Sequence, residues 1–306
     1  MIEVNELTKR YGDTLAVDGL SFTVRPGHVT GFLGPNGAGK STTLRIALGL
    51  HDPTGGSVTV DGHRFRDRPR GLRHVGALLD AHDVHGGRTA RTQLYVLARS
   101  NRIPRRRADE VLEQVGLAGA GRRRISGFSL GMRQRLGIAT ALLGDPPVLL
   151  FDEPLNGLDP EGVQWLRGLF RRWAGEGRTV LVSSHLMSEM ENTADQLVVI
   201  GRGSLIAAES LADFAARGTR PSVTVRTPDH DHDRTALTEL LTGEGAEVRR
   251  AGGALTVTGL SADRIGELAL RHGVLLHELS ARPASLEEAF MALTADSADH
   301  VTGAAR

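Results

Sequence analysis

Apolar residues fall in two different patterns along the chain. Short apolar runs bordered by glycine, proline or acidic residues occur at 29–33, 148–151, 179–182 and 197–200, a pattern typical of strands buried in a parallel sheet. Between residues 88 and 143 the apolar positions recur instead every three or four residues, which predicts an α-helical insertion. We therefore expect an α/β core that a helical segment interrupts.

After residue 218 the pattern changes again. A Gly-Thr-Arg-Pro break is followed by short alternating stretches. The expected elements are strands at 222–226, 246–249, 255–257 and 274–277 and helices at 265–270 and 286–294. We therefore expect two domains, residues 1–218 and a small C-terminal α+β domain over residues 219–306.

The last expected helix carries its own start signal. Ser285 stands at the N-cap position with Glu288 three residues later, the pattern of a capping box. Leu286, Phe290 and Leu293 then fall on one helix face. Two roles are open to this apolar face: packing on the small sheet of its own domain, which we favour, or binding a partner.

Candidate chemistry begins where the first buried run ends. The P-loop pattern G-x-x-x-x-G-K-[S/T] is matched by Gly34, Pro35, Asn36, Gly37, Ala38, Gly39, Lys40, Ser41 and Thr42. Such a loop turns backbone N–H groups onto a polyphosphate, and the helix after it favours bound anions. We expect Lys40 to reach the β- and γ-phosphates and the Ser41 hydroxyl to ligate Mg²⁺. Lysine stands here although the chain has only two lysines, Lys9 and Lys40, among 37 basic side chains.

Two acidic residues follow the second apolar run, and a histidine follows the third. Asp152 and Glu153 come directly after 148–151, and His185 ends the stretch that begins at residue 179. Open α/β sheets bind ligands at the carboxyl edge of their strands. We expect Asp152 to hold Mg²⁺, Glu153 to accept a proton from an attacking water, and His185 to contact the γ-phosphate. A lone acidic pair or histidine is more often structural, but the P-loop upstream favours the functional interpretation.

Other features leave alternatives open. Tyr11 precedes the P-loop, and its ring could stack on a purine or pack against the adjoining turn, which is the more common role. Arginine runs at 105–107 and 122–124 could bind nucleic acid, but no aromatic residues are interleaved, so we favour a solvated helix face. The net charge of +1 gives no general electrostatic reason for nucleic-acid binding.

Composition narrows the cellular context. The 306 residues include no cysteine, which excludes disulfides and thiolate metal sites and is typical of a reducing compartment. The first residues lack the basic and apolar regions of a signal peptide, and the most apolar stretch, 136–151, is broken by glycine and proline. We therefore expect a cytoplasmic protein that reaches a membrane only through a partner.

Taken together, these stretches resemble the nucleotide-binding subunit of an ATP-binding cassette (ABC) transporter over about residues 2–215. In that family's terms, Walker A is at 34–42, Walker B at 148–153, the D-loop at 156–159 and the switch histidine at 185. The resemblance implies a P-loop ATPase fold that binds ATP and Mg²⁺. It also implies that Glu153 is the catalytic glutamate and that Tyr11 stacks on adenine, which reverses the preference stated above.

The signature segment departs from the family pattern, which is normally Leu-Ser-Gly-Gly-Gln. Ser129 and Gly131 keep the family's residue types, and the resemblance implies that they contact the γ-phosphate bound by the opposite subunit. Leu130 stands in place of a glycine, and Met132 in place of a glutamine.

A second departure is Asp80, where the family usually has glutamine. Its carboxylate could still ligate Mg²⁺, together with Ser41 and Asp152, but its negative charge beside the γ-phosphate disfavours nucleotide binding unless the metal offsets it. Both departures resemble the drug- and antibiotic-export branch, typified by the daunorubicin and bacitracin resistance ATPases. The α+β tail ending in Leu-Glu-Glu-Ala-Phe is similar to the C-terminal domain of these subunits.

The resemblance implies an ATPase that energises efflux of a drug-, antibiotic- or lipid-like compound through a separate integral-membrane permease of the ABC-2 type. It implies a homodimer that sandwiches ATP and lies on the cytoplasmic face of the cell membrane, without nucleic acid as a partner. Two alternatives remain, a non-transport ABC ATPase and a nucleotide-binding regulatory module.

Overall fold

The computed structural model describes residues 1–217, 222–228, 231–251, 253–282 and 286–298. These residues form two compact units, one of Met1–Leu211 with the end of the chain from Leu293, the other of Ala212–Ala292. The division falls before residue 218, and it places the end of the last helix with the first unit.

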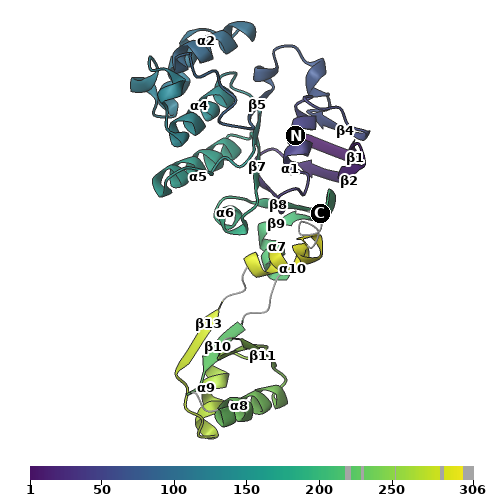
Figure 1. Ribbon diagram of the computed structural model, residues 1–306, viewed down its shortest axis with the longest axis vertical. Helices are drawn as coiled ribbons and strands as arrows, with labels where there is room; N and C mark the ends of the chain where they lie inside the picture. The colour runs from purple at the N-terminus through teal and green to yellow at the C-terminus, as the bar shows by residue number, and fades with distance from the viewer. Residues whose placement is uncertain (218–221, 229–230, 252, 283–285, 299–306) are drawn as a thin grey trace, which may run out of the picture. The chain divides into compact units, whose positions relative to one another are not determined.

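The first unit is built on a six-stranded sheet in the order β5-β6-β7-β3-β8-β9. Figure 1 labels four of its strands, β5, β7, β8 and β9. Its strands are β3 (Val29–Leu33), β5 (Val75–Leu78), β6 (Val148–Phe151), β7 (Thr179–Ser184), β8 (Gln196–Gly201) and β9 (Ser204–Ser210). Neighbouring strands are parallel except β8 and β9, which are antiparallel. Strands β3, β6 and β7 are buried along their whole length, which explains their continuous apolar sequences.

A second, antiparallel sheet has the order β2-β1-β4 and consists of β1 (Ile2–Tyr11), β2 (Thr14–Val24) and β4 (Gly55–Val60). Its buried side chains share one core with the parallel sheet and with α1 (Lys40–Ala47). Phe22 and Phe32 meet across this core, with ring centroids 5.3 Å apart. Because β3 and α1 both pack in it, the core fixes the two ends of the loop between them.

Helices follow the strands of the parallel sheet. They include α5 (Pro160–Gly175) and the short α6 (Met187–Glu191). Asp159 caps α5, because its Oδ1 accepts a hydrogen bond from the N–H of Gly162 at 2.7 Å. Phe151 at the end of β6 packs on Phe170 and Trp173 of α5, with ring centroids 5.2 and 5.8 Å away. This contact anchors the end of the strand that carries the acidic pair.

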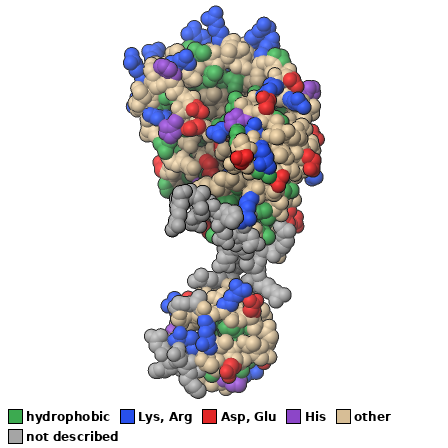
Figure 2. All heavy atoms as spheres, turned by 45° about the vertical axis from the view of Figure 1, so that its right-hand side comes forward, with side chains coloured by type: hydrophobic (Ala, Val, Ile, Leu, Met, Phe, Trp, Pro, Cys, Tyr) green, Lys and Arg blue, Asp and Glu red, His purple; other side chains and the backbone are tan. Residues whose placement is uncertain are grey.

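The helical insertion is confirmed. It contains α2 (Ala90–Ser100), α3 (Arg106–Gln114) and α4 (Leu130–Leu142). The arginines of both runs are exposed except Arg107, which is half-buried and pairs with Glu110 at 3.2 Å. Arg105 stacks on the ring of Tyr95 at 4.2 Å. No aromatic residue is interleaved in the arginine run, but the fold brings one from α2 into contact with it. Figure 2 shows Lys and Arg side chains gathered at the end of this unit where α2 lies in Figure 1.

The second unit contains a four-stranded antiparallel sheet in the order β11-β12-β10-β13. Its elements are α7 (Leu211–Arg217, whose first residue belongs to the first unit), β10 (Ser222–Arg226), α8 (Asp231–Gly243), β11 (Glu247–Ala251), β12 (Ala254–Thr258), α9 (Ala262–Arg271) and β13 (Glu278–Arg282). Side chains of α8, α9 and the sheet form its separate core. The expected strands at 222–226, 246–249 and 255–257 are confirmed within a residue or two at their ends.

The expected strand at 274–277 is wrong. Residues 274–277 form a loop, and the strand begins at Glu278, which pairs with Arg226 of β10. Val274 and Leu276 pack against the small core while Leu275 is exposed, so a loop crossing the core produces the same alternation as a strand. Periodicity of burial does not by itself require main-chain pairing.

The last helix, α10, spans Leu286–Ala298. Leu286 and Phe290 on its expected apolar face are buried, whereas Leu293 is exposed. Ser285 lies outside the described residues, so its capping role stays a prediction. Among the helices that the structure describes, none combines the length and apolar composition needed to cross a bilayer.

Candidate active site

Three neighbouring strands bring the P-loop, the acidic pair and His185 together. In the order β6-β7-β3, each strand ends at the same edge of the sheet because all three run parallel. The acidic pair follows β6, His185 follows β7, and the P-loop follows β3. The topology therefore places segments more than 100 residues apart in sequence beside one another.

Two glycines of the P-loop lie close against neighbouring backbone. Gly39 has φ +104°, and a Cβ there would lie 2.6 Å from the carbonyl oxygen of Ala16. A Cβ on Gly34 would lie 2.5 Å from the carbonyl oxygen of Ile200. Both positions therefore exclude a side chain, one by backbone conformation and both by close backbone approach.

An open pocket surrounds the loop. It is lined by Ala16, Asn36, Gly37, Ala38, Gly39, Lys40, Ser41, Thr42 and Glu153. The pocket thus combines the expected phosphate-binding loop with one of the two expected acids. Within the described residues its lining does not include Tyr11, Asp80, Ser129 or Gly131.

Lys40 is buried at the start of α1, and its side chain is only 7% exposed. Its Nζ donates hydrogen bonds to the carbonyl oxygens of Gly34 at 2.6 Å and Pro35 at 3.2 Å, which hold it across its own loop. Burial lowers the pKa of Lys40, and the nearby carboxylates of Glu153 and Asp152 oppose that shift. A bound polyphosphate would supply further negative charge to this ammonium.

Glu153 has an unusual backbone conformation, with φ +48°. A left-handed conformation in a residue other than glycine costs about 1 kcal/mol and is concentrated at functional sites. The N–H of Glu153 donates to Ser183 Oγ at 3.0 Å, and Ser183 Oγ in turn donates to Asp152 Oδ1 at 2.5 Å. Ser183 is fully buried, so the end of β7 holds both acids in place.

The Glu153 carboxylate lies between two basic side chains. Its Oε1 is 3.9 Å from Lys40 Nζ, and its Oε2 is 2.9 Å from His185 Nδ1. A neutral His185 with its proton on Nδ1 donates this hydrogen bond. The expected catalytic glutamate is therefore hydrogen-bonded to the expected switch histidine and lies within ion-pair distance of the P-loop lysine.

The oxygen donors present fit a magnesium ion. Ser41 offers a hydroxyl on the pocket wall, and Asp152 offers the carboxylate oxygen that Ser183 does not occupy. Mg²⁺ prefers oxygen ligands and is usually held by one or two carboxylates together with substrate phosphates. Ser41 and Asp152 would hold it here, where it would offset charge on the transferring phosphoryl group.

Asp80 lies in the loop after β5 and is 51% exposed. Its carboxylate accepts hydrogen bonds from the backbone N–H of His82 at 2.7 Å and from the His82 ring at 3.1 Å. The backbone N–H of His82 holds the pKa of Asp80 below its usual value. In this conformation Asp80 Oδ1 is engaged by its own loop, and the metal role stays a prediction.

Tyr11 is the last residue of β1 and pairs with Thr14 of β2. Its side chain is partly exposed, and its hydroxyl forms a 2.5 Å hydrogen bond with His51 Nδ1. Lys9 Nζ lies 4.8 Å from the centre of its ring. The ring is thus positioned by His51 and Lys9 and is not buried in the adjoining turn.

The signature segment starts α4. Ser129 is its N-cap, because Ser129 Oγ accepts a hydrogen bond from the N–H of Met132 at 3.3 Å. Leu130 packs on Gly157 of the expected D-loop, where a Cβ would lie 2.7 Å from Leu130 Cγ. The leucine that departs from the family pattern therefore fits only because residue 157 has no side chain.

Sequence reasoning missed two supporting residues of the site. Ser183 had a weak signal, as a polar residue at the end of an apolar strand. Buried Gln134 had none: its Nε2 donates to the carbonyl oxygen of Asn156 at 3.1 Å and ties α4 to the D-loop. Both act through contacts between segments far apart in sequence.

Comparison with known proteins adds independent evidence. A profile of the ABC transporter family matches residues 17–156, and a profile of a domain of unknown function (DUF8746) matches residues 221–287. The chain is 43% identical over 209 residues to the bacitracin transport ATP-binding protein BcrA of Bacillus licheniformis, covering 67% of this chain and 68% of BcrA. It is 36% identical over 206 residues to the lantibiotic transport ATP-binding protein SrtF of Streptococcus pyogenes, covering 67% of this chain and 89% of SrtF.

Solved structures show the same fold. The dimeric cassette MJ0796 of a bacterial ABC transporter has a TM-score of 0.64 and 25% identity, covering 69% of this chain and 99% of that one. The same cassette in a post-hydrolysis state bound to ADP and Pi has a TM-score of 0.62 and 25% identity over the same shares.

Proposed function

Because the chain belongs to the ATP-binding subunits of ABC transporters, we propose that its ATPase activity drives export through a separate integral-membrane permease. The chain is an ABC ATPase by family and fold. We assign nucleotide binding to residues 1–218 and an accessory role to residues 219–306.

One observation carries the catalytic proposal: the Glu153 carboxylate lies between Lys40 and His185 at the rim of the P-loop pocket. Main-chain N–H groups of the loop and Lys40 bind the phosphates of ATP. Glu153 then orients the attacking water and accepts its proton. His185, hydrogen-bonded to that carboxylate, keeps it oriented toward the γ-phosphate.

The proposed working form is a homodimer that encloses two ATP molecules. Ser129 and Gly131 are absent from the lining of the P-loop pocket of their own chain, so a second copy would bring them to it. The MJ0796 cassette, which this chain resembles, is dimeric. In this arrangement ATP favours the closed dimer, and hydrolysis releases it.

The relatives support a proposal for the transported compound. BcrA is a bacitracin transport protein and SrtF a lantibiotic transport protein, so we propose an antibiotic-like compound as cargo and an ABC-2-type permease as partner. The chain would then work on the cytoplasmic face of the cell membrane, with Mg²⁺ and ATP bound at the site described above. Co-purification with a polytopic membrane protein tests this assignment, and recovery of the chain with ribosomes or DNA would contradict it.

The substitution Glu153→Gln tests the mechanism. It keeps the size of the side chain but removes the base, so phosphate release should fall by roughly 10²- to 10⁴-fold while ATP still binds. Light scattering should detect a dimer of this variant in the presence of ATP. The matched control is Glu161→Gln on the exposed first turn of α5, which should hydrolyse ATP at the normal rate. Normal turnover in Glu153→Gln would remove this residue from its role, and a monomer at saturating ATP would contradict the sandwich.

A further inference from the structure

We propose that His51 and Lys9 are positioning residues that hold the ring of Tyr11 for the base of the nucleotide. This inference rests on the proposed function, because it takes the P-loop pocket as the site of ATP. Neither residue lies in the P-loop, Walker B or signature segments, and among the described residues the contact that links each of them to the site is the one with Tyr11.

His51 fixes the far end of the ring. The Tyr11 hydroxyl and His51 Nδ1 are 2.5 Å apart, and the two rings meet edge to face at 5.8 Å. Tyr11 is 42% exposed, so few other contacts restrict its rotamer. An aromatic ring that must meet a base in one orientation gains from being held in that orientation before the ligand arrives.

Lys9 covers one face of the ring. Its Nζ lies 4.8 Å from the ring centre and donates a 2.7 Å hydrogen bond to the carbonyl oxygen of Asp52. A cation over one face leaves only the opposite face free for a stacked base. Of the 37 lysines and arginines in the chain, only Lys9 and Lys40 are lysines. Both lysines therefore serve the same proposed site, one at the phosphates and one behind the aromatic ring.

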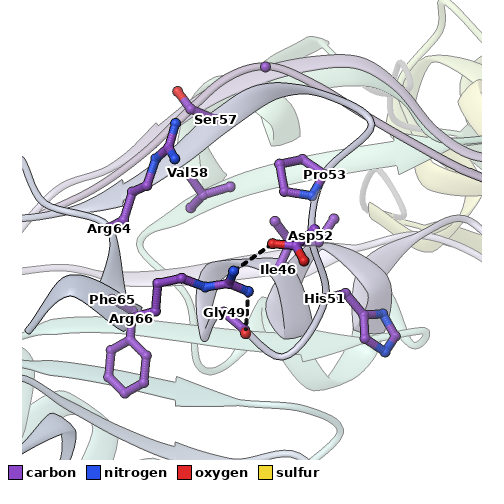
Figure 3. Close-up of a pocket in the computed structure, with 11 residues that line it drawn as sticks. Ile46, Gly49, His51, Asp52, Pro53, Ser57, Val58, Arg64, Phe65 and Arg66 are labelled. Carbon is purple, nitrogen blue, oxygen red and sulfur yellow. Dashed lines mark hydrogen bonds and ion pairs between the residues drawn. The ribbon is translucent and has the colours of Figure 1, made fainter.

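The partners of Tyr11 and Lys9 belong to one short loop. His51 and Asp52 follow α1, the helix that begins in the P-loop. Arg66 pins this loop, because it forms a 2.7 Å ion pair with Asp52 and donates to the carbonyl oxygen of Gly49 at 2.8 Å (Figure 3). The start of α1 thus carries the P-loop lysine, and the loop that follows α1 contacts Tyr11 and Lys9.

The opposing interpretation is that Tyr11 only closes the hairpin between β1 and β2. In that case substitution of His51 would change stability but would not distinguish ligands with a base from ligands without one. Titration calorimetry with MgATP and with magnesium tripolyphosphate separates the two interpretations, because tripolyphosphate offers phosphates and no base.

In His51→Ala and in Lys9→Ala the dissociation constant of MgATP should rise about 2- to 10-fold, while that of tripolyphosphate changes less than about 2-fold. His51→Gln, whose side-chain oxygen can still accept from Tyr11, should restore most of the ATP affinity. The control is His28→Ala, because His28 contacts only its own turn at Pro26 in the described structure.

Equal weakening of both ligands in His51→Ala would overturn the inference, and so would no change in either. Tyr11→Ala separates the two levels of the proposal. If Tyr11→Ala weakens ATP alone but His51→Ala does not, the aromatic platform stands and the positioning role fails. If the unmodified protein binds neither ligand, the proposed function itself fails and the positioning role with it.

Discussion

Lys40 lies buried at the start of α1, in the loop-to-helix turn that follows the central strand β3, whereas Tyr11 ends a strand of the antiparallel sheet with 42% of its surface exposed. Lys40 is held by backbone carbonyl groups of its own loop. Tyr11 is held by one hydrogen bond to His51 and one cation above its ring. The phosphates of the proposed ligand would therefore meet a site whose shape is set by backbone groups. Its base would meet a ring that is held by side chains.

This difference predicts how each end responds to mutation. At the phosphate end, strand order and excluded Cβ positions fix the geometry, so substitutions there change both chemistry and folding. At the base end, single exposed contacts contribute about 0.5–1.5 kcal/mol each and leave the fold unchanged. We therefore expect large effects around Lys40 and small, ligand-specific effects around Tyr11.

The largest expected effect on binding comes from Lys40→Ala. It removes charge-assisted hydrogen bonds to the phosphates, each typically contributing about 1.5–3 kcal/mol, or roughly 10- to 100-fold in affinity. Calorimetry should show MgATP and tripolyphosphate weakened to the same degree, the opposite of the result expected at the base end. Selective loss of ATP alone would mean that Lys40 does not act on phosphates and would remove the contrast between the two ends.

The next effect concerns Ser183→Ala. This change leaves the N–H of Glu153 without its buried acceptor, which should lower the free energy of unfolding by about 1–3 kcal/mol. Turnover should fall as well, because both acids lose their support from β7.

Ser184 provides a matched control for that variant. Its hydroxyl is equally buried, accepts from the N–H of Leu186 and donates to Glu189, but it does not contact either acid of the site. Ser184→Ala should therefore lose stability in urea unfolding with little loss of turnover per folded molecule. Equal losses of turnover in both variants would show that β7 acts on the site only through general stability.

Leu130 of the signature segment and Gly157 lie close enough for substitution at one to affect the other. Gly157→Ala should destabilise the protein, because φ is +76° there and the new methyl group would clash with Leu130. In the Leu130→Ala background the clash disappears and only the backbone strain of about 1–2 kcal/mol remains. A double-mutant cycle by thermal unfolding should give a coupling of roughly 0.5–3 kcal/mol. Additive effects would show that Leu130 and Gly157 do not depend on each other.

The smallest expected effect is a dependence on alkaline pH. Burial lowers the pKa of Lys40 from 10.5 in the unfolded chain, so between the lowered value and 10.5 the unfolded state binds more protons. The free energy of unfolding should therefore rise with pH through that window. This gain in stability is lost again as pH falls back through the pKa of Lys40 in the folded protein. ATP affinity should fall across the same window, because phosphates require the ammonium.

The variant Lys40→Met, which lacks the titrating ammonium, is the control for this prediction. Urea unfolding of both proteins from neutral pH to pH 10.5 should show the alkaline rise only in the unmodified chain. Parallel curves for the two proteins would show that Lys40 does not titrate in this range.

Much of the phosphate end could be predicted from the sequence, because its signals are local. The run 29–33 is continuously apolar and ends in the glycine pattern, and β3 has those bounds. The acids after 148–151 lie at the same edge because both segments are parallel strands. Local pattern and sheet topology agree at these positions, so the local pattern is enough to predict where these residues lie.

The base end could not be predicted in the same way. His51 is 40 residues from Tyr11, and no periodicity or motif links the two.

Two other features were also beyond local sequence patterns. Ser183 resembles any polar residue at the end of a strand, although it holds both acids. The wrong strand at 274–277 has the related cause that a loop over a core shows the alternation of a strand. Contacts between distant segments leave no trace in local composition.

The left-handed backbone of Glu153 has a consequence for engineering. Asparagine and glycine adopt that conformation more easily than glutamate does, so a screen that rewards heat resistance alone would drift toward them at this position. Such variants would unfold at a higher temperature but would not hydrolyse ATP. Directed evolution of this chain therefore has to select for turnover in every round, since here robustness and catalysis make opposite demands on a single residue.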